Sequence, residues 1–393
     1  MVKKLRIDWL MFAVAAGLAV FGSIMVYSAS AMIALRETQG ESQFTYFYKQ
    51  SGFTLLGLAA MYLTSKINYH RYESKTIVYG ILGITAILLL AVFGSPPING
   101  ARRWVRYSGM SFQPSEIAKV ALPIFLAYFL TKNEDTVEDL RETVLPCGLV
   151  LGCLGALVMA EPDLGTTMVL CAIFVTVYFA AGAKLKHITL TIGSLLLVGI
   201  LFLILSPWRM KRLFAFINPW ENSGDGGYQV VQGLYAIGSG GIMGEGFAKG
   251  RQKLFYLPYP YSDFIFAVVG EELGLIGTLT VVLAFGFLLW RGARAALRAP
   301  DRFGMLLGIG IITGIIVQAL FNISVVISIL PAKGIPLPFI SYGGSSIVVT
   351  LFAVGILLNI SQYAGTVGLK VDVKNDEFET PPRRRKRGQT GLK

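Results

Sequence analysis

Apolar runs of membrane-spanning length recur along most of this chain. A helix needs about 20 consecutive apolar residues to cross ~30 Å of hydrocarbon. Runs close to or above this length lie at residues 8–30, 46–65, 76–94, 115–131, 143–160, 165–183, 188–206, 264–290, 304–330 and 341–362. Only 15% of the 393 residues are charged, which is too little for the surface of a soluble domain of this size. The sequence therefore predicts an all-α integral membrane protein with about ten transmembrane helices.

The spacing of the runs divides the chain into two parts. Residues 1–364 form the predicted polytopic membrane domain, and residues 207–262 form a large extracytoplasmic loop between its seventh and eighth helices. Residues 365–393 are polar and basic and contain proline. This tail is predicted to be disordered and to lie against anionic lipid headgroups.

Lys and Arg side chains predict the orientation of the chain, because cytoplasmic loops carry most of them. With ten spans, one set of basic segments falls on a single side, and it comprises Lys3, Lys4, Arg6, Lys66, Arg71, Lys75, Lys184, Lys186, Arg291, Arg294, Arg298, Arg302 and Arg383–Arg387. Both termini are therefore predicted to be cytoplasmic.

Two loops on the predicted outer side are basic against this rule. The short segment 95–114 carries Arg102, Arg103 and Arg106, and the long segment 207–262 carries six more Lys and Arg residues. An anion that arrives from the membrane, such as a lipid phosphate or pyrophosphate, is the natural partner for such cations. The alternative is that long loops are translocated across the membrane regardless of their charge. This explanation fits the long segment 207–262 better than the short segment 95–114.

Ionisable side chains inside or beside the apolar runs are the candidates for chemistry, because they are costly at membrane depth and usually functional. Glu116 and Lys119 are three residues apart, so they share a helix face and can pair. They form either a structural ion pair or the polar wall of a substrate cavity. Glu271 and Glu272 lie inside a run and need cationic or backbone partners, which favours structural anchoring.

Asp263 stands where the long outer loop meets the eighth run. A carboxylate at this lip, where water, headgroups and hydrocarbon meet, is placed to act as a general base. The alternative is a helix cap that complements the helix dipole. The Gly-rich segment Gly238–Gly246 has neither the spacing of a Walker A motif nor a strand–helix context. We therefore expect no nucleotide and no organic cofactor.

Several motifs occur in one order along the chain, and together they resemble a known family. They are Asn99–Trp104, Gln113–Glu116, Pro162–Thr166, Asn218–Trp220, Gly227–Gln229, Ala236–Gly238, Asp263–Phe266, Gly270–Glu272 and Pro331–Ser346. Over residues 8–362 the chain resembles the SEDS family, which contains FtsW, RodA and SpoVE. The segments Gln252–Lys253 and Ala267–Glu272 favour the FtsW or SpoVE branch over RodA.

The resemblance implies a peptidoglycan glycosyltransferase of the bacterial cytoplasmic (inner) membrane. Members of the family polymerise lipid II, whose disaccharide-pentapeptide is linked to undecaprenyl pyrophosphate, and work with a class B penicillin-binding protein. Other divisome or elongasome proteins and membrane lipids are further implied partners, and nucleic acid is not. The branch favours septal synthesis during cell division, while elongation and sporulation stay open. By position, Asp263 matches the family's essential aspartate and Trp104 its sensitive tryptophan.

The chain departs from the family pattern at a few positions. Tyr259 and Tyr261 stand where the family usually has Glu and His, so any role of those side chains does not transfer. Glu161 stands where Gln is frequent, and Gly233 where Ser is frequent.

The mechanism that these residues predict is an inverting glycosyl transfer. Asp263 would remove a proton from the acceptor sugar hydroxyl, and an active site facing outside would receive the lipid-linked donor. Cationic side chains would stabilise the departing pyrophosphate. The predicted substrate-binding set is Trp104, Arg102, Arg103, Glu116, Lys119, Arg212 and Lys253. A divalent cation, Mg²⁺ or Mn²⁺, could share this task with Asp263 as one ligand.

Two rival functions remain open from the residues. In a lipid II flippase, the interior charges Glu116, Lys119, Glu271 and Glu272 would line a path and no bond would be made. The outward bias of the cationic loops argues against this, because a flippase needs headgroup contacts on both faces. In a non-catalytic scaffold, the outer loops would recruit the penicillin-binding protein.

Overall fold

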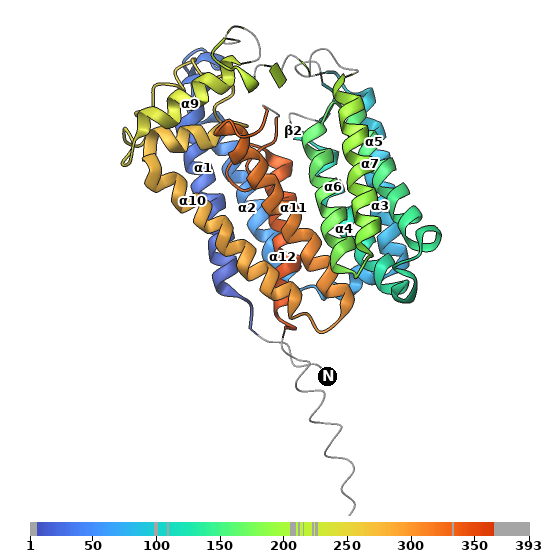
Figure 1. Cartoon of the computed structure of the whole chain (residues 1–393). Helices are drawn as coiled ribbons and strands as arrows, with labels where there is room; N and C mark the ends of the chain where they lie inside the picture. Colours follow the sequence, from blue (N-terminus) through green and yellow to red (C-terminus); the bar gives the residue numbers. More distant parts are fainter. Residues whose placement is uncertain are drawn as a thin grey trace, which may run out of the picture.

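Long helices lying side by side make up most of the chain (Figure 1). The computed structural model describes residues 6–97, 101–107, 110–204, 210, 213–214, 216–221, 224, 227–331 and 334–364. Its long helices are α1 (Trp9–Glu37), α2 (Thr45–Lys66), α3 (Lys75–Ala91), α4 (Pro114–Lys132), α5 (Leu145–Ala160), α6 (Leu164–Ala180), α7 (Leu185–Ile204), α9 (Tyr228–Gly240), α10 (Ile265–Leu297), α11 (Arg302–Val326) and α12 (Gly344–Ser361). The short elements are η1 (Tyr69–Glu73), η2 (Val92–Gly94), η3 (Glu134–Thr136), the π-helix η4 (Leu140–Val144), and the strands β1 (Val105–Tyr107) and β2 (Met110–Phe112).

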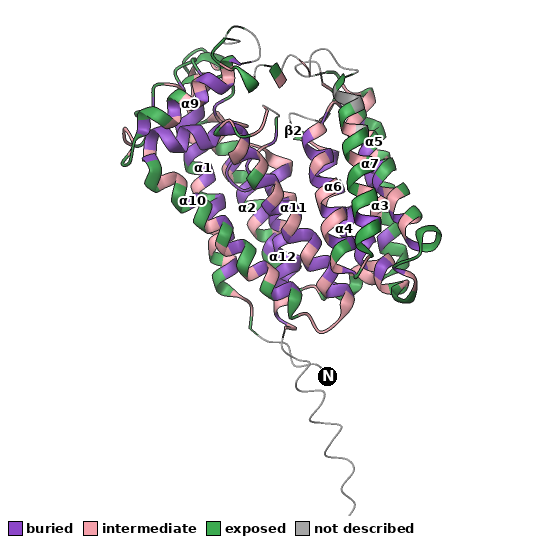
Figure 2. Cartoon of the chain, viewed as in Figure 1, coloured by how far each residue is buried: buried purple, intermediate pink, exposed green. Residues whose placement is uncertain are grey.

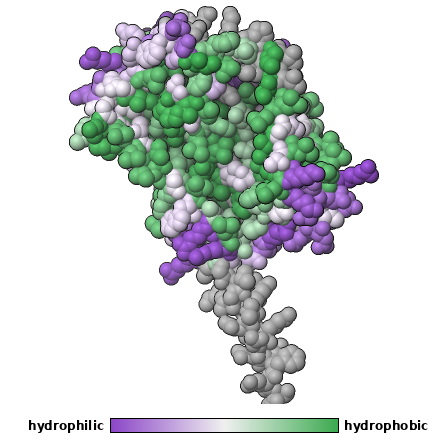
Figure 3. All heavy atoms as spheres, viewed as in Figure 1, coloured by the Kyte–Doolittle hydropathy of each residue, from purple (hydrophilic) through white to green (hydrophobic). Residues whose placement is uncertain are grey.

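The helical membrane class predicted from the sequence is confirmed. Each predicted apolar run coincides with a helix of the structure. Among the described residues, seven helical segments are long and apolar enough to cross a membrane: α1, α3 with η2, α4, η4 with α5, α10, α11 and α12. On the face shown in Figure 3, hydrophobic residues cover most of the middle of the molecule, and hydrophilic residues gather in patches towards its upper and lower ends. The count of ten spans stays a prediction, and the predicted disordered tail lies outside the described residues.

Helix α11 lies at the centre of the bundle. It contacts α10, α6, α4 and α12, so it joins the α1–α2–α10–α12 group to the α3–α7 group (Figure 1). Buried residues gather on these inner faces, and exposed residues lie on the outward faces of the peripheral helices (Figure 2). The start of α1 and the end of α12 lie at one end of the bundle, and β2 and α9 lie at the other. The loops that carry the candidate residues are therefore gathered at this second end.

Helix α10 is broken in its first half. Gly274 has φ 64° and ψ −158°, and the break leaves backbone groups of the flanking turns without helical partners. The glycine-rich segment after α9 supplies them: Gly246 donates to the carbonyl of Glu272 at 3.0 Å, and Leu275 donates to the carbonyl of Gly241 at 2.9 Å. These bonds satisfy backbone groups that would otherwise be buried and unpaired. This structural role accounts for the Gly-rich motif that superficially resembles a phosphate loop.

The close approach of α9 and α10 predicts an asymmetric response to alanine. A Cβ on Gly240 would lie 1.9 Å from the carbonyl oxygen of Gly270, whereas a Cβ on Gly238 would meet nothing within 4 Å. Gly240→Ala is expected to destabilise the fold by about 1–3 kcal/mol, because the helices must separate. Gly238→Ala, two residues away in the same helix, should leave the stability unchanged or raise it slightly, because Ala favours a helix more than Gly does. Thermal unfolding of both variants in detergent measures the difference, and equal melting temperatures would contradict the predicted packing.

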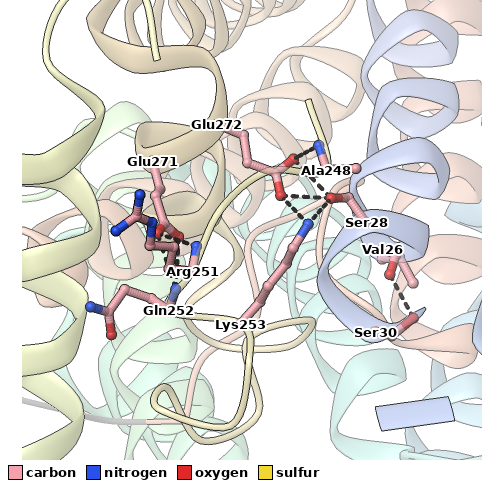
Figure 4. Close-up of polar contacts among 9 residues, drawn as sticks. All are labelled: Val26, Ser28, Ser30, Ala248, Arg251, Gln252, Lys253, Glu271 and Glu272. Atoms are coloured by element: carbon pink, nitrogen blue, oxygen red, sulfur yellow. Dashed lines mark hydrogen bonds and ion pairs between the residues drawn. The ribbon is translucent and has the colours of Figure 1, made fainter. Parts of the chain in front are cut away.

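Glu271 and Glu272 anchor the loop that follows α9 (Figure 4). The carboxylate of Glu271 accepts hydrogen bonds from the backbone N–H groups of Arg251 at 2.6 Å and Gln252 at 3.0 Å. The carboxylate of Glu272 pairs with the Lys253 ammonium group at 2.6 Å. It also accepts bonds from Ser28 Oγ on α1 at 2.6 Å and from the backbone N–H of Ala248 at 3.0 Å. The structural anchoring predicted for this carboxylate pair is therefore confirmed.

Candidate functional site

Four segments that are distant in sequence meet at the end of the bundle opposite the start of α1 (Figure 1). They are the stretch before the β1–β2 hairpin, the turn between α5 and α6, the residues that precede α10, and the loop that precedes α12. The side-chain and backbone contacts described below hold these segments together. These segments include described residues of four of the nine motifs that carry the family resemblance, and the fold brings these four motifs together.

Asp263 is held at this site through its backbone. Its carbonyl oxygen accepts a hydrogen bond from Asn322 Nδ2 on α11 at 2.7 Å, and the same amide donates to the carbonyl of Ile335 at 2.8 Å. Helix α10 begins two residues later at Ile265, and no side-chain hydrogen bond caps it. Asp263 thus lies one residue before the N-cap Phe264, and the role of its half-buried carboxylate as a general base stays a prediction.

The carboxylate of Asp263 and the guanidinium of Arg103 face the same point. A Cβ placed on Gly334 would lie 2.9 Å from Asp263 Oδ2 and 3.7 Å from Arg103 Nη1. A side chain at position 334 would therefore occupy the space that these two charged groups border. The structure thus brings together one predicted base and one predicted cation beside an exposed glycine.

The loop before α12 is bound to the residues around Asp263. Ser341 Oγ donates to the carbonyl of Ser262 at 2.7 Å and accepts from the N–H of Leu337 at 2.7 Å. The N–H of Tyr342 donates to the carbonyl of Tyr261 at 2.9 Å. These bonds fix Gly334 and Asp263 relative to one another, which is the preorganisation that a catalytic group needs.

Arg103 reaches from the stretch before β1 to the turn between α5 and α6. Its Nε donates to the carbonyl of Glu161 at 3.2 Å, and its Nη2 donates to the carbonyl of Pro162. Its neighbours are placed differently: Arg102 is exposed and donates to the carbonyl of Phe93 at 2.7 Å, and Trp104 is half-buried. Of the three adjacent motif residues, Arg103 is the one that the described contacts bring to Asp263.

Asp163 fixes the start of α6. Its Oδ1 accepts from the N–H of Thr166 at 3.0 Å, and its Oδ2 accepts from Thr166 Oγ1 at 2.8 Å. The second oxygen also accepts from Gln113 Nε2 at 3.2 Å, just before α4 begins at Pro114. The carboxylate thus caps one helix and ties it to the start of another. Both residues lie in motifs visible in the sequence, but their pairing depends on the fold and does not follow from the sequence alone.

Glu116 and Lys119 form the predicted ion pair, with the Lys119 ammonium 2.8 Å from Glu116 Oε2. Lys119 also donates to Gln318 Oε1, and Gln318 Nε2 donates to the carbonyl of Pro336 at 2.8 Å. The chain of contacts supports the loop before α12. The cavity beside this pair measures about 20 Å³, which is room for about one water molecule. A direct contact of either residue with a substrate stays a prediction.

The remaining predicted ligands are not gathered at Asp263. Lys253 is buried, and its ammonium group contacts Glu272 at 2.6 Å and Ser28 Oγ at 2.8 Å, so its described contacts are structural. Its role in substrate binding stays a prediction. Arg212 lies outside the described residues. Across the described ranges, no cluster of three or more His, Cys, Asp or Glu side chains is placed to hold a metal ion.

Glu161 is a site residue for which sequence reasoning assigned no role. Its side chain is 0% exposed, and neither carboxyl oxygen has a hydrogen-bond partner among the described residues. Burial and the nearby Asp163 carboxylate raise the pKa of Glu161 to about 8, against the opposing charge of Arg103. The signal was present in the sequence, because a Glu stands there where a Gln is frequent in the family.

A long apolar cavity runs beside this site. It has a volume of about 1000 Å³ and lies between α5, α6 and α7. Its walls extend from Leu140 near one end of the bundle to Met159 and Ala160 next to the Glu161 turn. Such a cavity in a membrane protein suits a hydrocarbon chain.

Comparisons with known proteins agree on one family. The profile of FTSW_RODA_SPOVE, described as "Cell cycle protein", matches residues 8–366. The chain is 41% identical over 362 residues to "Probable peptidoglycan glycosyltransferase FtsW" of Geobacter metallireducens, covering 91% of this chain and 95% of that one. It is 40% identical over 365 residues to "Stage V sporulation protein E" of Bacillus subtilis, covering 92% and 99%.

Two solved structures are similar to the whole bundle. One belongs to work described as "Structural coordination of polymerization and crosslinking by a peptidoglycan synthase complex"; its TM-score is 0.75 at 25% identity, covering 96% of this chain and 100% of that one. The other is the rod shape determining protein RodA of Thermus thermophilus, with a TM-score of 0.66 at 26% identity, covering 92% and 98%.

Proposed function

The chain belongs to the SEDS family of FtsW, RodA and SpoVE proteins, and from this premise we propose that it polymerises peptidoglycan glycan strands from lipid II. It is a peptidoglycan glycosyltransferase of the multi-pass membrane type. The observation that carries the proposal is the Asp263 carboxylate facing the Arg103 guanidinium across Gly334. A base and a cation at one point suit a reaction that removes a proton and expels an anion.

The proposed step is an inverting displacement. Asp263 takes the proton of the 4-hydroxyl of the acceptor's terminal N-acetylglucosamine while that oxygen attacks the anomeric carbon of the donor's N-acetylmuramic acid. The new glycosidic bond forms as the bond from the anomeric carbon to undecaprenyl pyrophosphate breaks. The bonding electron pair leaves with the pyrophosphate, and the charge of Arg103 stabilises it.

The other predicted residues are assigned supporting parts. Arg102 is exposed beside Arg103 and is available to the donor pyrophosphate, and Trp104 offers a half-buried aromatic face for a sugar. Glu116 and Lys119 position the loop that carries Gly334 through Gln318. A divalent cation, Mg²⁺ or Mn²⁺, stays a prediction. Asp263 is its one proposed protein ligand, because the described residues build no multi-ligand cluster.

The membrane supplies the donor. We place the termini in the cytoplasm and the site on the outer side, because the basic loops of the sequence follow that orientation. The apolar cavity between α5, α6 and α7 ends beside the Glu161 turn and would hold part of the undecaprenyl chain. A class B penicillin-binding protein is the proposed partner, in septal synthesis during cell division, since one structural neighbour comes from a peptidoglycan synthase complex.

Reconstitution in lipid vesicles tests the proposed function against its rival. Purified protein is incorporated into vesicles that carry fluorescent lipid II, with and without the cognate penicillin-binding protein. Polymerisation is read as a glycan ladder on a gel, and transbilayer movement is read by quenching of the outer leaflet. Polymer without accelerated movement supports the proposal. Accelerated movement with no polymer would assign the chain to the flippases.

Replacement of Arg103 should lower the polymerisation rate more than replacement of Arg106, a neighbouring residue on the β1–β2 hairpin. Arg103→Met removes a charge-assisted contact worth about 1.5–3 kcal/mol, so the polymerisation rate is expected to fall roughly ten- to hundred-fold. Arg106 is exposed on β1 and is the matched control, because its removal changes the net charge equally. Initial rates with lipid II measure both. Equal losses in the two variants would show that only the overall charge of the loop matters.

A further inference from the structure

Glu161 is buried at the C-terminus of α5 without the partners that a buried carboxylate needs. Its side chain is 0% exposed, and both carboxyl oxygens lack hydrogen-bond partners among the described residues. An isolated ionised carboxylate is strongly disfavoured in such surroundings, so the group responds by holding a proton. A neutral carboxyl in this place is a stored proton beside the candidate site.

The charged groups around Glu161 come from two neighbouring segments. The Asp163 carboxylate, at the start of α6, disfavours the ionised form, and the Arg103 guanidinium favours it. On α4, which also packs against α5, the charges of Glu116 and Lys119 are paired with one another. Among the described residues, Arg103 is therefore the cation on which a change of charge at Glu161 acts.

Arg103 lies between the turn that carries Glu161 and the point that Asp263 borders. Its Nε and Nη2 are bound to the backbone carbonyls of Glu161 and Pro162, while its Nη1 faces the Gly334 position that Asp263 Oδ2 also borders. A charge that appears at Glu161 therefore acts on a guanidinium that is already fixed to the same turn. Its effect reaches the reaction point through Arg103 and not through contact with the substrate.

We propose that Glu161 is a proton-controlled positioning residue that sets how strongly Arg103 binds the lipid pyrophosphate. In its neutral form, Glu161 leaves the positive charge of Arg103 available to the anionic donor. When it loses its proton, the new carboxylate compensates that charge and competes with the pyrophosphate for it. This inference rests on the proposed function and adds a regulated step to the same site.

The pH range follows from the direction of the shift. Burial raises the pKa of Glu161 to about 8, so the group is largely neutral at pH 7 and largely ionised at pH 9. Donor binding should be strong below this range and weaken as the pH rises through it. Gln has the same shape and no proton to lose, so Glu161→Gln removes the response and leaves the remaining titratable groups in place.

Binding of lipid II at pH 7 and pH 9 tests the inference without catalysis. The probe is lipid II in nanodiscs, whose pyrophosphate diester keeps a constant charge over this range. In the wild type the affinity is expected to fall about five- to ten-fold between the two pH values, because roughly a tenth of Glu161 stays neutral at pH 9. In Glu161→Gln the ratio of the two affinities should stay within about two-fold. The same fall in both proteins would overturn the inference.

Infrared difference spectroscopy provides a second, independent readout. A buried neutral carboxyl gives a C=O band that disappears on ionisation, so the wild type should lose such a band with a midpoint near pH 8. Glu161→Gln should lack it. Absence of the band from the wild type would overturn the inference, even with normal activity. If the band and the pH-dependent binding both appear but no polymer forms, the proposed catalysis fails while the control of binding by Glu161 stands.

Discussion

Asp263→Asn is expected to lower the polymerisation rate by about 10²–10⁴-fold, which is the usual contribution of a positioned general base. Asparagine keeps the size of the side chain but cannot accept the proton of the attacking hydroxyl. The fold should survive, because the bond from Asn322 is made to the backbone carbonyl of residue 263. Steady-state rates of lipid II consumption measure the loss, with thermal unfolding as the check on folding.

Asp135→Asn is the matched control for this variant. Asp135 is exposed and lies in η3, far from the site. Its replacement by Asn makes the same change in charge and shape as the replacement of Asp263. Its rate should match that of the wild type. A rate for Asp263→Asn within a few-fold of this control would remove Asp263 from the chemistry. A loss accompanied by an equal loss of lipid II binding would instead assign Asp263 to substrate binding.

Lys253→Met is expected to destabilise the fold by about 3–5 kcal/mol, because it leaves the Glu272 carboxylate buried without its cation. The Lys253 ammonium group is 2.6 Å from Glu272, and both side chains are almost completely buried. Reversible unfolding in mixed detergent measures the change. Lys249→Met, an exposed position in the same loop, is the control and should change stability little.

The double variant Lys253→Met with Glu272→Gln separates structure from substrate binding at this pair. Removing both charges should recover most of the lost stability, since Ser28 and the N–H of Ala248 can still bind an amide. Wild-type stability of Lys253→Met together with loss of lipid II binding would contradict the structural role. It would support the substrate contact that the sequence predicts for Lys253.

The helices could be predicted because hydropathy and length are local properties of a run. The break in α10 and the close approach of α9 to α10 could not be predicted in this way. The break at Gly274 is accompanied by pairing between Gly241–Gly246 and the first half of α10, which are contacts between separate segments. Likewise, Glu271 and Glu272 could be predicted to need partners, but their partners on α1 and in the loop become known only from the fold.

The site was predicted in part. Asp263 and Arg103 can be identified from the family motifs and from the unusual charge of the predicted outer loop, and in the structure both border one point beside Gly334. The sequence could not show that Arg103 alone among its neighbours reaches Asp263, because that depends on the turn between α5 and α6. The sequence shows Glu161 only as a departure from the family pattern. The burial of its side chain and its lack of hydrogen-bond partners among the described residues are known only from the fold.

The most direct test of the central claim is the glycan product made by the purified protein. Wild type and Asp263→Asn are incubated with lipid II and a divalent cation, with and without the class B penicillin-binding protein, and glycan length is read on a gel. A ladder of polymer from the wild type and none from Asp263→Asn is the predicted result. Equal ladders from both proteins, or no polymer from either while the partner complex is intact, would contradict a polymerase centred on Asp263.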